Sequence, residues 1–92
     1  MNDIIGLANE LRRRNFIDWR QFHYCQAWTS QLLQARYHLI KSYGTIVGIA
    51  DTDSYKVYEF GKYSSTTSKQ FTRICNEKFR GYTRVFINQT NW

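Results

Sequence analysis

The sequence predicts a small α+β domain, in which an N-terminal helix or helices precede a β-hairpin, an amphipathic helix and a third strand. Two β-branched runs separated by an acidic turn indicate the hairpin, and an apolar stripe at helical spacing follows them. The order α-α-β-β-α-β predicts a small, mostly antiparallel sheet with a helix packed on one face. The 92 residues suit a single domain, with a helical part over residues 1–37 and a ββαβ core over residues 38–92.

The first predicted helix covers about residues 3–14 and ends in a basic turn. Apolar side chains recur at helical spacing within it, and a polar residue at its start can serve as the cap. Its last turn holds Arg12, Arg13 and Arg14, where cations meet the negative end of the helix dipole.

A second helix is predicted to begin at Asp18, which is a suitable N-cap residue. Trp19, Phe22 and Cys25 share one side of such a helix, although the aromatic pattern is irregular. Periodicity leaves open whether the following "TSQLLQARY" extends this helix or begins a connection. The N-terminal helices are expected to cover the sheet edge or the same face as the later helix.

The β-hairpin is predicted within residues 39–61. "LIKSYGTIVGIA" alternates as one strand, and Gly44 and Gly48 on one face leave room for a helix or an aromatic ring. "DTDS" at residues 51–54 is turn chemistry, because short polar side chains hydrogen-bond their own backbone. "YKVYEFG" then forms the second strand of the pair.

An amphipathic helix is predicted over about Thr67–Arg80, because Phe71, Ile74 and Phe79 recur at helical spacing. Gly81 suits the turn that ends it. "YTRVFIN" then alternates as a third strand, which can lie at a sheet edge and pair with a second copy of the chain.

The hydroxyl-rich stretch "KYSSTTSKQFTR" at residues 62–73 has two interpretations. Thr66 or Thr67 can cap the helix, and Gln70 can close a capping box with Thr67. One cap uses one hydroxyl, so the others are available to an anion at the helix N-terminus. Lys69 lies in the first turn, where the helix dipole disfavours a cation and an anionic partner would offset the cost.

The chain lacks the residue constellations that catalysis and metal binding need. Cys25 and Cys75 form no C-x-x-C pair, and neither His23 nor His38 has a ligand at metal-binding spacing. The N-terminal segment carries acidic residues before its arginines, and no apolar run approaches the roughly 20 residues of a membrane helix. We therefore expect a non-enzymatic, cytoplasmic protein with no cofactor, no metal and no membrane partner.

A net charge of +6 arises from 13 Lys and Arg against 7 Asp and Glu. Such a surface attracts nucleic acid, anionic membrane or an acidic protein, and the alternative is that the charge serves solubility alone. Cations hold phosphates, and aromatic faces stack on unpaired bases. The basic clusters are Arg12–Arg14 with Arg20, Lys62 with Lys69 and Arg73, and Lys78 with Arg80 and Arg84, among which lie Phe16, Trp19, Tyr63 and Tyr82.

Residues of about 39–76 resemble small uncharacterised proteins from phages, prophages and plasmids of Gram-positive bacteria. The resemblance rests on "KSYGTIV" at Lys41–Val47, "YEFGKYS" at Tyr58–Ser64 and "TTSK" at Thr66–Lys69. It implies a mobile-element protein in a bacterial host cell that binds nucleic acid, a host regulator or the bacterial immune machinery.

These observations predict a non-enzymatic phage or mobile-element protein that engages nucleic acid or a nucleoprotein complex through a basic surface. The alternatives are an anti-defence inhibitor, such as an anti-CRISPR protein that blocks a host immune protein, and a structural or dimerising module. The predicted binding residues are Arg12, Arg13, Arg14, Arg20, Lys62, Tyr63, Ser65, Thr66, Lys69 and Arg73.

Overall fold

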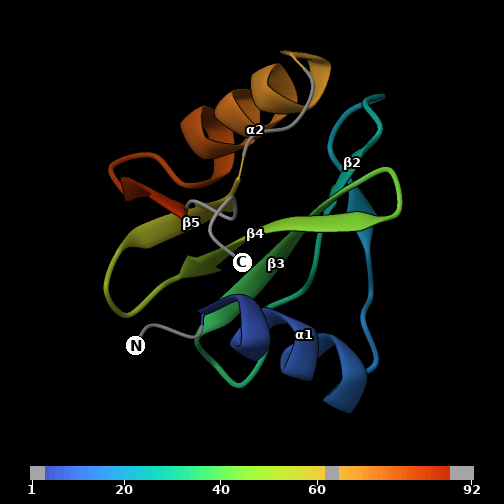
Figure 1. Cartoon of the computed structure of the whole chain (residues 1–92), viewed down its shortest axis with the longest axis vertical. Helices are drawn as coiled ribbons and strands as arrows, with labels where there is room; N and C mark the ends of the chain where they lie inside the picture. The colour runs from blue at the N-terminus through green and yellow to red at the C-terminus, as the bar shows by residue number, and fades with distance from the viewer. Residues whose placement is uncertain (1–3, 62–64, 88–92) are drawn as a thin grey trace.

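The chain forms an α+β fold of three layers, with one helix on each face of a sheet (Figure 1). The computed structural model describes residues 4–61 and 65–87. Within these ranges no helix is long and apolar enough to cross a membrane. The elements are α1 (Ile4–Arg14), β1 (Arg20–Gln21), β2 (Ala27–Thr29), β3 (Tyr37–Ser42), β4 (Thr45–Asp51), β5 (Lys56–Phe60), α2 (Ser65–Lys78) and β6 (Thr83–Ile87).

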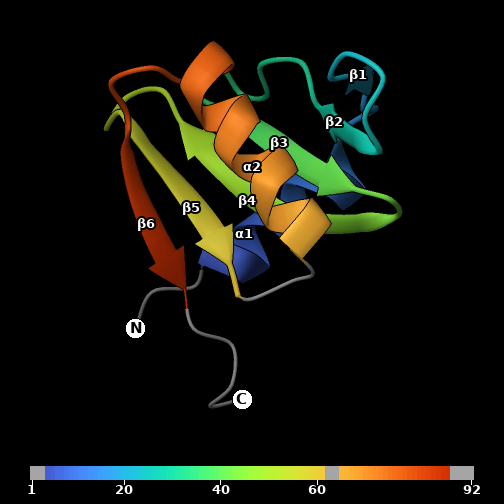
Figure 2. The ribbon, with the colours of Figure 1, turned by 90° about the horizontal axis from the view of Figure 1, so that it is seen from above.

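The sheet has six strands in the described residues, and its strand order β1-β2-β3-β4-β5-β6 follows the chain. Every neighbouring pair is antiparallel except β5 and β6, which are parallel. A parallel pair needs a crossover, and α2 supplies it by running across one face of the sheet (Figure 2). The predicted mostly antiparallel sheet and the helix between its last two strands are therefore confirmed.

The predicted second helix is wrong, because the segment after α1 contains the antiparallel strands β1 and β2. Phe22 belongs to the apolar cluster beneath α2, whereas Trp19 packs against the cluster beneath α1. The two rings thus cover opposite faces of the sheet, which one side of a single helix could not do. The helical assignment of residues 1–37 holds only for α1, and α1 covers the face opposite α2 instead of an edge or the same face (Figure 2).

The predicted single strand over Leu39–Ala50 is also wrong, because a tight turn at Tyr43–Gly44 divides it into β3 and β4. A register shift then places Ile40 opposite Gly48 and Lys41 opposite Ile46, so one residue of β4 is extra. This bulge changes the alternation, and Ile46 and Ile49 both join the cluster beneath α1. A strictly alternating pattern assigns these two side chains to opposite faces.

The two faces of the sheet carry separate apolar clusters. Val57, Phe71 and Ile74 are among the buried residues between α2 and the sheet, while Leu11 and Leu39 are among those between α1 and the sheet. The amphipathic stripes of both helices are thus explained by burial against opposite sheet faces.

Gly48 allows α2 to approach the sheet closely. A Cβ atom at this position would lie 2.6 Å from the ring of Phe71 and 2.5 Å from the carbonyl oxygen of Tyr58. The expectation that a glycine here admits an aromatic ring is confirmed, whereas a Cβ at Gly44 would meet no atom within 4 Å.

Helix α2 begins at Ser65, two residues before the predicted start, so Thr67 lies inside the first turn instead of at the cap. The Thr67 side chain is buried, and its Oγ1 atom lies 3.2 Å from Oγ of Ser42. Oε1 of Gln70 is buried without a hydrogen-bond partner. The predicted capping box is therefore wrong, and Thr67 instead links α2 to the end of β3.

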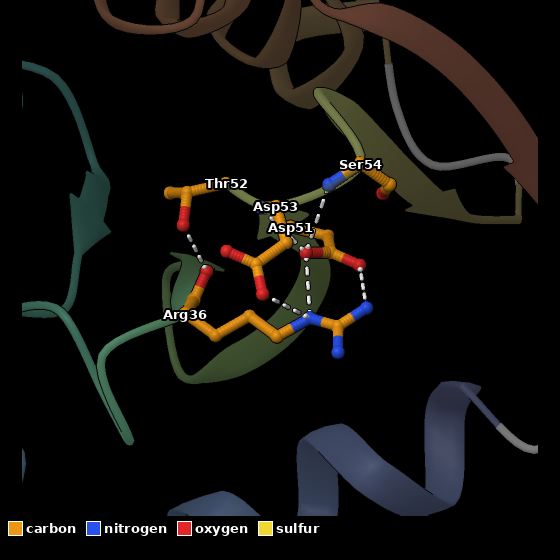
Figure 3. Close-up of polar contacts among 5 residues, drawn as sticks. All are labelled: Arg36, Asp51, Thr52, Asp53 and Ser54. Atoms are coloured by element: carbon orange, nitrogen blue, oxygen red, sulfur yellow. Dashed lines mark hydrogen bonds and ion pairs between the residues drawn. The ribbon is translucent and has the colours of Figure 1, made fainter.

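A polar cluster joins the loop before β3 to the turn between β4 and β5 (Figure 3). Arg36 donates to both carboxylate oxygens of Asp51 at 2.8 Å, and Oδ1 of Asp51 also accepts the N–H of Asp53 at 3.0 Å. The Thr52 hydroxyl donates to the Arg36 carbonyl oxygen at 2.8 Å. The predicted turn chemistry of "DTDS" is confirmed, and the partner Arg36 comes from another loop.

The ionised form of Asp51 is strongly favoured in this cluster. Its carboxylate is buried, and the hydrogen bonds from Arg36 lower the pKa of Asp51 to about 2 against the opposing effect of burial. The same hydrogen bonds raise the pKa of Arg36. The carboxylate therefore stays charged and satisfied, and it holds two loops together.

Candidate nucleic-acid interface

The predicted basic residues of α1 and α2 lie on opposite faces of the sheet but at the same end of it (Figure 1). Arg12 lines a groove of about 310 Å³ together with Gly44 and Thr45, so the end of α1 meets the β3–β4 turn. Thr67 contacts Ser42 beside the same turn, so the start of α2 meets it from the other face. We call this part of the molecule the Tyr43 end.

The α1 side of the Tyr43 end holds a lysine between two indole rings. Nζ of Lys41 lies 4.4 Å from the ring centroid of Trp19 and 5.0 Å from that of Trp28. Burial lowers the pKa of Lys41, and the nearby charge of Arg12 lowers it further. Two cations of like charge thus lie close together, an arrangement that an anion would stabilise.

The α2 side adds Lys69 and Arg73, which line one shallow groove on the helix surface. The guanidinium of Arg73 lies 5.7 Å from the ring centroid of Phe22, and Nη1 lies 3.7 Å from Sγ of Cys25. Arg73 therefore reaches the turn between β1 and β2. The tertiary structure brings this turn, the β3–β4 turn and the start of α2 into one region.

Positive charge at the Tyr43 end is largely unneutralised. Every Asp and Glu in residues 4–61 and 65–87 lies within 4.0 Å of a basic side chain. At this end, Nη2 of Arg73 lies 4.0 Å from Oε2 of Glu77, which is at the upper limit for an ion pair. Across the described ranges, the cations without a carboxylate within that distance are Arg12, Arg13, Lys41, Lys56, Lys69, Lys78 and Arg80.

Exposed aromatic rings lie among the cations of the Tyr43 end. Tyr43 is 56% exposed at the β3–β4 turn, and Tyr24 is 99% exposed at the β1–β2 turn. The two turns are joined, because the N–H of Tyr43 donates to the carbonyl oxygen of Gln26 at 2.9 Å. Sequence reasoning missed both tyrosines, since it assigned one to a strand and the other to a helix. The "SYGT" turn with its single glycine was the only available signal for Tyr43.

The predicted residues differ in their relation to this region. Ser65 and Thr66 are exposed in the first turn of α2, near the Tyr43 end. Arg20 does not join them, because it lines a separate groove with His38 and Lys78, away from the β3–β4 turn. Arg12 and Lys69 belong to the region, and Arg13 is exposed beside Arg12. Arg14 forms an ion pair with Glu10 at 3.6 Å. Lys62 and Tyr63 lie outside the described residues.

Within the described ranges, the remaining titratable groups form no catalytic arrangement that the geometry supports. Nε2 of His23 lies 2.8 Å from Oε1 of Glu77, which links the β1–β2 turn to α2. Burial raises the pKa of Cys75 to about 11, so its thiol is a poor nucleophile at neutral pH. In the part of the chain that the structure describes, no three His, Cys, Asp or Glu residues cluster closely enough to hold a metal ion.

Comparison of the chain with protein-family models, curated proteins and solved structures found no match. The resemblance of residues 39–76 to phage and plasmid proteins therefore stays a prediction. The functional interpretation rests on the geometry and charge of the Tyr43 end.

Proposed function

We propose that this chain is a non-enzymatic protein that binds nucleic acid through the Tyr43 end. The observation that carries the proposal is the meeting of cations from both helices around exposed tyrosine rings, where most of those cations have no carboxylate partner among the described residues. Cations on a protein surface bind phosphates and release the counterions of a polyanion. Aromatic rings beside them supply contacts to bases.

The cations divide into two groups that lie on either side of the β3–β4 turn. Arg12 and Lys41 lie on the α1 side, and Lys69 and Arg73 lie on the α2 side. A backbone that crosses the turn would place successive phosphates against the two groups. The like charges of Arg12 and Lys41 favour such a partner, because the attraction of each cation to a nearby phosphate offsets their mutual repulsion.

A salt titration tests the proposal directly. Fluorescence anisotropy with a labelled random-sequence oligonucleotide is expected to show an affinity that falls steeply and log-linearly as salt rises. The double variant Arg12→Glu/Lys69→Glu is expected to bind about 100-fold more weakly at low salt. The magnitude of its slope of log K against log salt concentration is expected to be smaller by roughly two.

The matched control is Lys56→Glu/Arg80→Glu, which changes the net charge equally. Both residues are exposed and have no carboxylate within 4.0 Å in residues 4–61 and 65–87, but they lie toward the opposite end of the sheet. This control is expected to bind within about threefold of the wild type, apart from a uniform effect of net charge. If both double variants weaken binding equally, the Tyr43 end is not the interface.

An anti-defence role is the alternative in which the partner is a host protein. A pull-down from nuclease-treated host lysate distinguishes the two. A complex that survives nuclease and is lost in Arg12→Glu/Lys69→Glu assigns the same basic surface to an acidic protein partner.

Dimerisation is a second candidate that one observation favours. Strand β6 lies at the end of the strand order and pairs within the described residues only with β5, and Phe86 on it is 50% exposed. An edge strand with free backbone groups can pair with a second copy. Light scattering across micromolar concentrations tests this, and a monomer throughout would remove the candidate.

A further inference from the structure

We propose that the Tyr43 end selects single-stranded over double-stranded nucleic acid, by stacking unpaired bases on Tyr43 and Tyr24. This inference rests on the proposed function and names the class of nucleic acid that the same surface takes.

The ring of Tyr43 contributes little burial to the fold. Its backbone φ is 56°, in the left-handed region that glycine and asparagine adopt with least cost, and its side chain is more than half exposed. A tyrosine here gains neither a favourable backbone nor a buried ring. No aromatic contact of Tyr43 occurs among the described residues.

Tyr55, in the turn between β4 and β5, provides a comparison within the same sheet. It also has φ 56° in a hairpin turn and is 62% exposed, but its ring meets that of Tyr82 edge-on with centroids 5.4 Å apart. The fold therefore explains the ring of Tyr55 and leaves that of Tyr43 available. A flat, exposed ring on a tight turn is a surface on which a base can stack.

The adjacent turn presents a second ring. Tyr24 is almost fully exposed, and the hydrogen bond from the N–H of Tyr43 to the Gln26 carbonyl oxygen holds the two turns together. Cys25, beside Tyr24, contacts Arg73 of α2. Two rings and a phosphate-binding cation are thus held in one region by contacts between three separate elements.

The alternation of rings and cations fits a single strand better than a duplex. A single strand exposes base faces and phosphates together, whereas a duplex encloses its base faces and must unstack to offer them. Charge alone would favour the duplex, because its phosphate density is higher and its counterion release is larger. A preference for the single strand would therefore report the rings and not the cations.

The test compares three probes of equal length: a single-stranded oligonucleotide, the duplex of the same sequence, and a single strand with abasic sites that retains only the phosphate backbone. The wild-type chain is expected to bind the single strand about tenfold more tightly than either other probe. Tyr43→Asn is expected to lose about tenfold on the single strand and to leave binding of the abasic strand unchanged.

Asparagine is chosen because it tolerates the left-handed backbone, so this variant should fold. The matched control Tyr55→Asn makes the same substitution at the same backbone conformation and is expected to keep the single-strand preference. Circular dichroism of both variants verifies folding. A second variant, Tyr24→Ser, is expected to weaken single-strand binding as well.

The possible outcomes separate the inference from the proposed function. Equal, salt-dependent binding of all three probes, or unchanged single-strand affinity in both Tyr43→Asn and Tyr24→Ser, overturns the stacking inference and leaves the proposed function standing. Absence of binding to every probe at low salt overturns both. Loss confined to the single strand in Tyr43→Asn supports the inference.

Discussion

The two ends of strand β4 treat charge in opposite ways. At its last residue, the buried carboxylate of Asp51 accepts hydrogen bonds from Arg36 and from its own turn, so the polar groups satisfy one another. Before its first residue, the Tyr43–Gly44 turn is flanked by cations from both helices and by exposed rings. At one end the polar groups pair with one another, and at the other most of the described cations have no described carboxylate within 4.0 Å.

Under the proposed function, this difference separates the residues that stabilise the fold from those that bind a partner. The Asp51 carboxylate is buried, and its desolvation is offset because Arg36, whose side chain is 42% exposed, donates to both of its oxygens (Figure 3). Unpaired surface cations such as Lys69 add little to stability, so they can be placed for a ligand. Substitutions at the two ends should therefore affect different properties.

The largest expected effect is on stability at the Asp51 end of β4. Asp51→Ala is expected to lower the free energy of unfolding by about 3 kcal/mol, because Arg36 and the turn N–H groups lose their acceptor. Urea denaturation measures the change. Asp53→Ala is the control, since its carboxylate is 65% exposed and 3.7 Å from Arg36, and less than about 0.5 kcal/mol is expected. Equal effects of the two substitutions would contradict the assigned role of Asp51.

A dependence on pH follows from the same carboxylate. The folded-state pKa of Asp51 is lowered to about 2 from an ordinary value of 3.8, so its contribution is fully present above about pH 4 and is lost as pH falls toward 2. The loss is expected to reach about 2 kcal/mol. Denaturation of the wild type and of Asp51→Asn between pH 6 and 2 measures it, because only the difference between them isolates this group. A constant difference would argue against the lowered pKa.

A smaller effect of opposite sign is expected at the Tyr43 end. Tyr43→Asn is expected to raise the free energy of unfolding by about 1 kcal/mol, because asparagine relieves the left-handed backbone and little burial is lost. Thermal denaturation checks the sign. Tyr55→Asn should show less gain, since it also loses the contact with Tyr82. Strong destabilisation by Tyr43→Asn would mean that the ring serves the fold after all.

The smallest expected effect comes from the unpaired cations. Arg12→Ala/Lys69→Ala should change the free energy of unfolding by less than about 0.5 kcal/mol, because neither side chain has a carboxylate within 4.0 Å among the described residues. Chemical denaturation measures it in parallel with the binding assay. A loss of more than about 1 kcal/mol would show that these cations belong to the fold and would blur the distinction between the ends.

Sequence patterns predicted the elements whose signals are local. Helix α2 and the β4–β5 hairpin follow from an apolar stripe and from turn chemistry at Asp51, both of which act over a few residues. The helix predicted over Trp19 to Cys25 was wrong, because its aromatic rings pack on two faces of a sheet. That sheet includes strands distant in the sequence, so no local pattern reveals it. The bulge in β4 was not predicted for a similar reason, since the register of a strand depends on its partner strand.

The candidate site was predicted only in part. The basic residues of α1 and the start of α2 are visible as clusters in the sequence, but Arg20 belongs to a different groove. Lys41 was absent from the predicted site, because its role depends on Trp19 and Trp28 lying on either side of it. Tyr43 was absent because only the turn exposes its ring.

The sequence by itself determined the basic charge, the α+β class and the amphipathic helix that crosses the sheet, because composition and periodicity are properties of short segments. The tertiary structure alone decided that the end of α1 and the start of α2 meet at the β3–β4 turn from opposite faces. It also decided which cations have carboxylate partners. Such proximity arises from packing between residues distant in the chain, which no local pattern encodes.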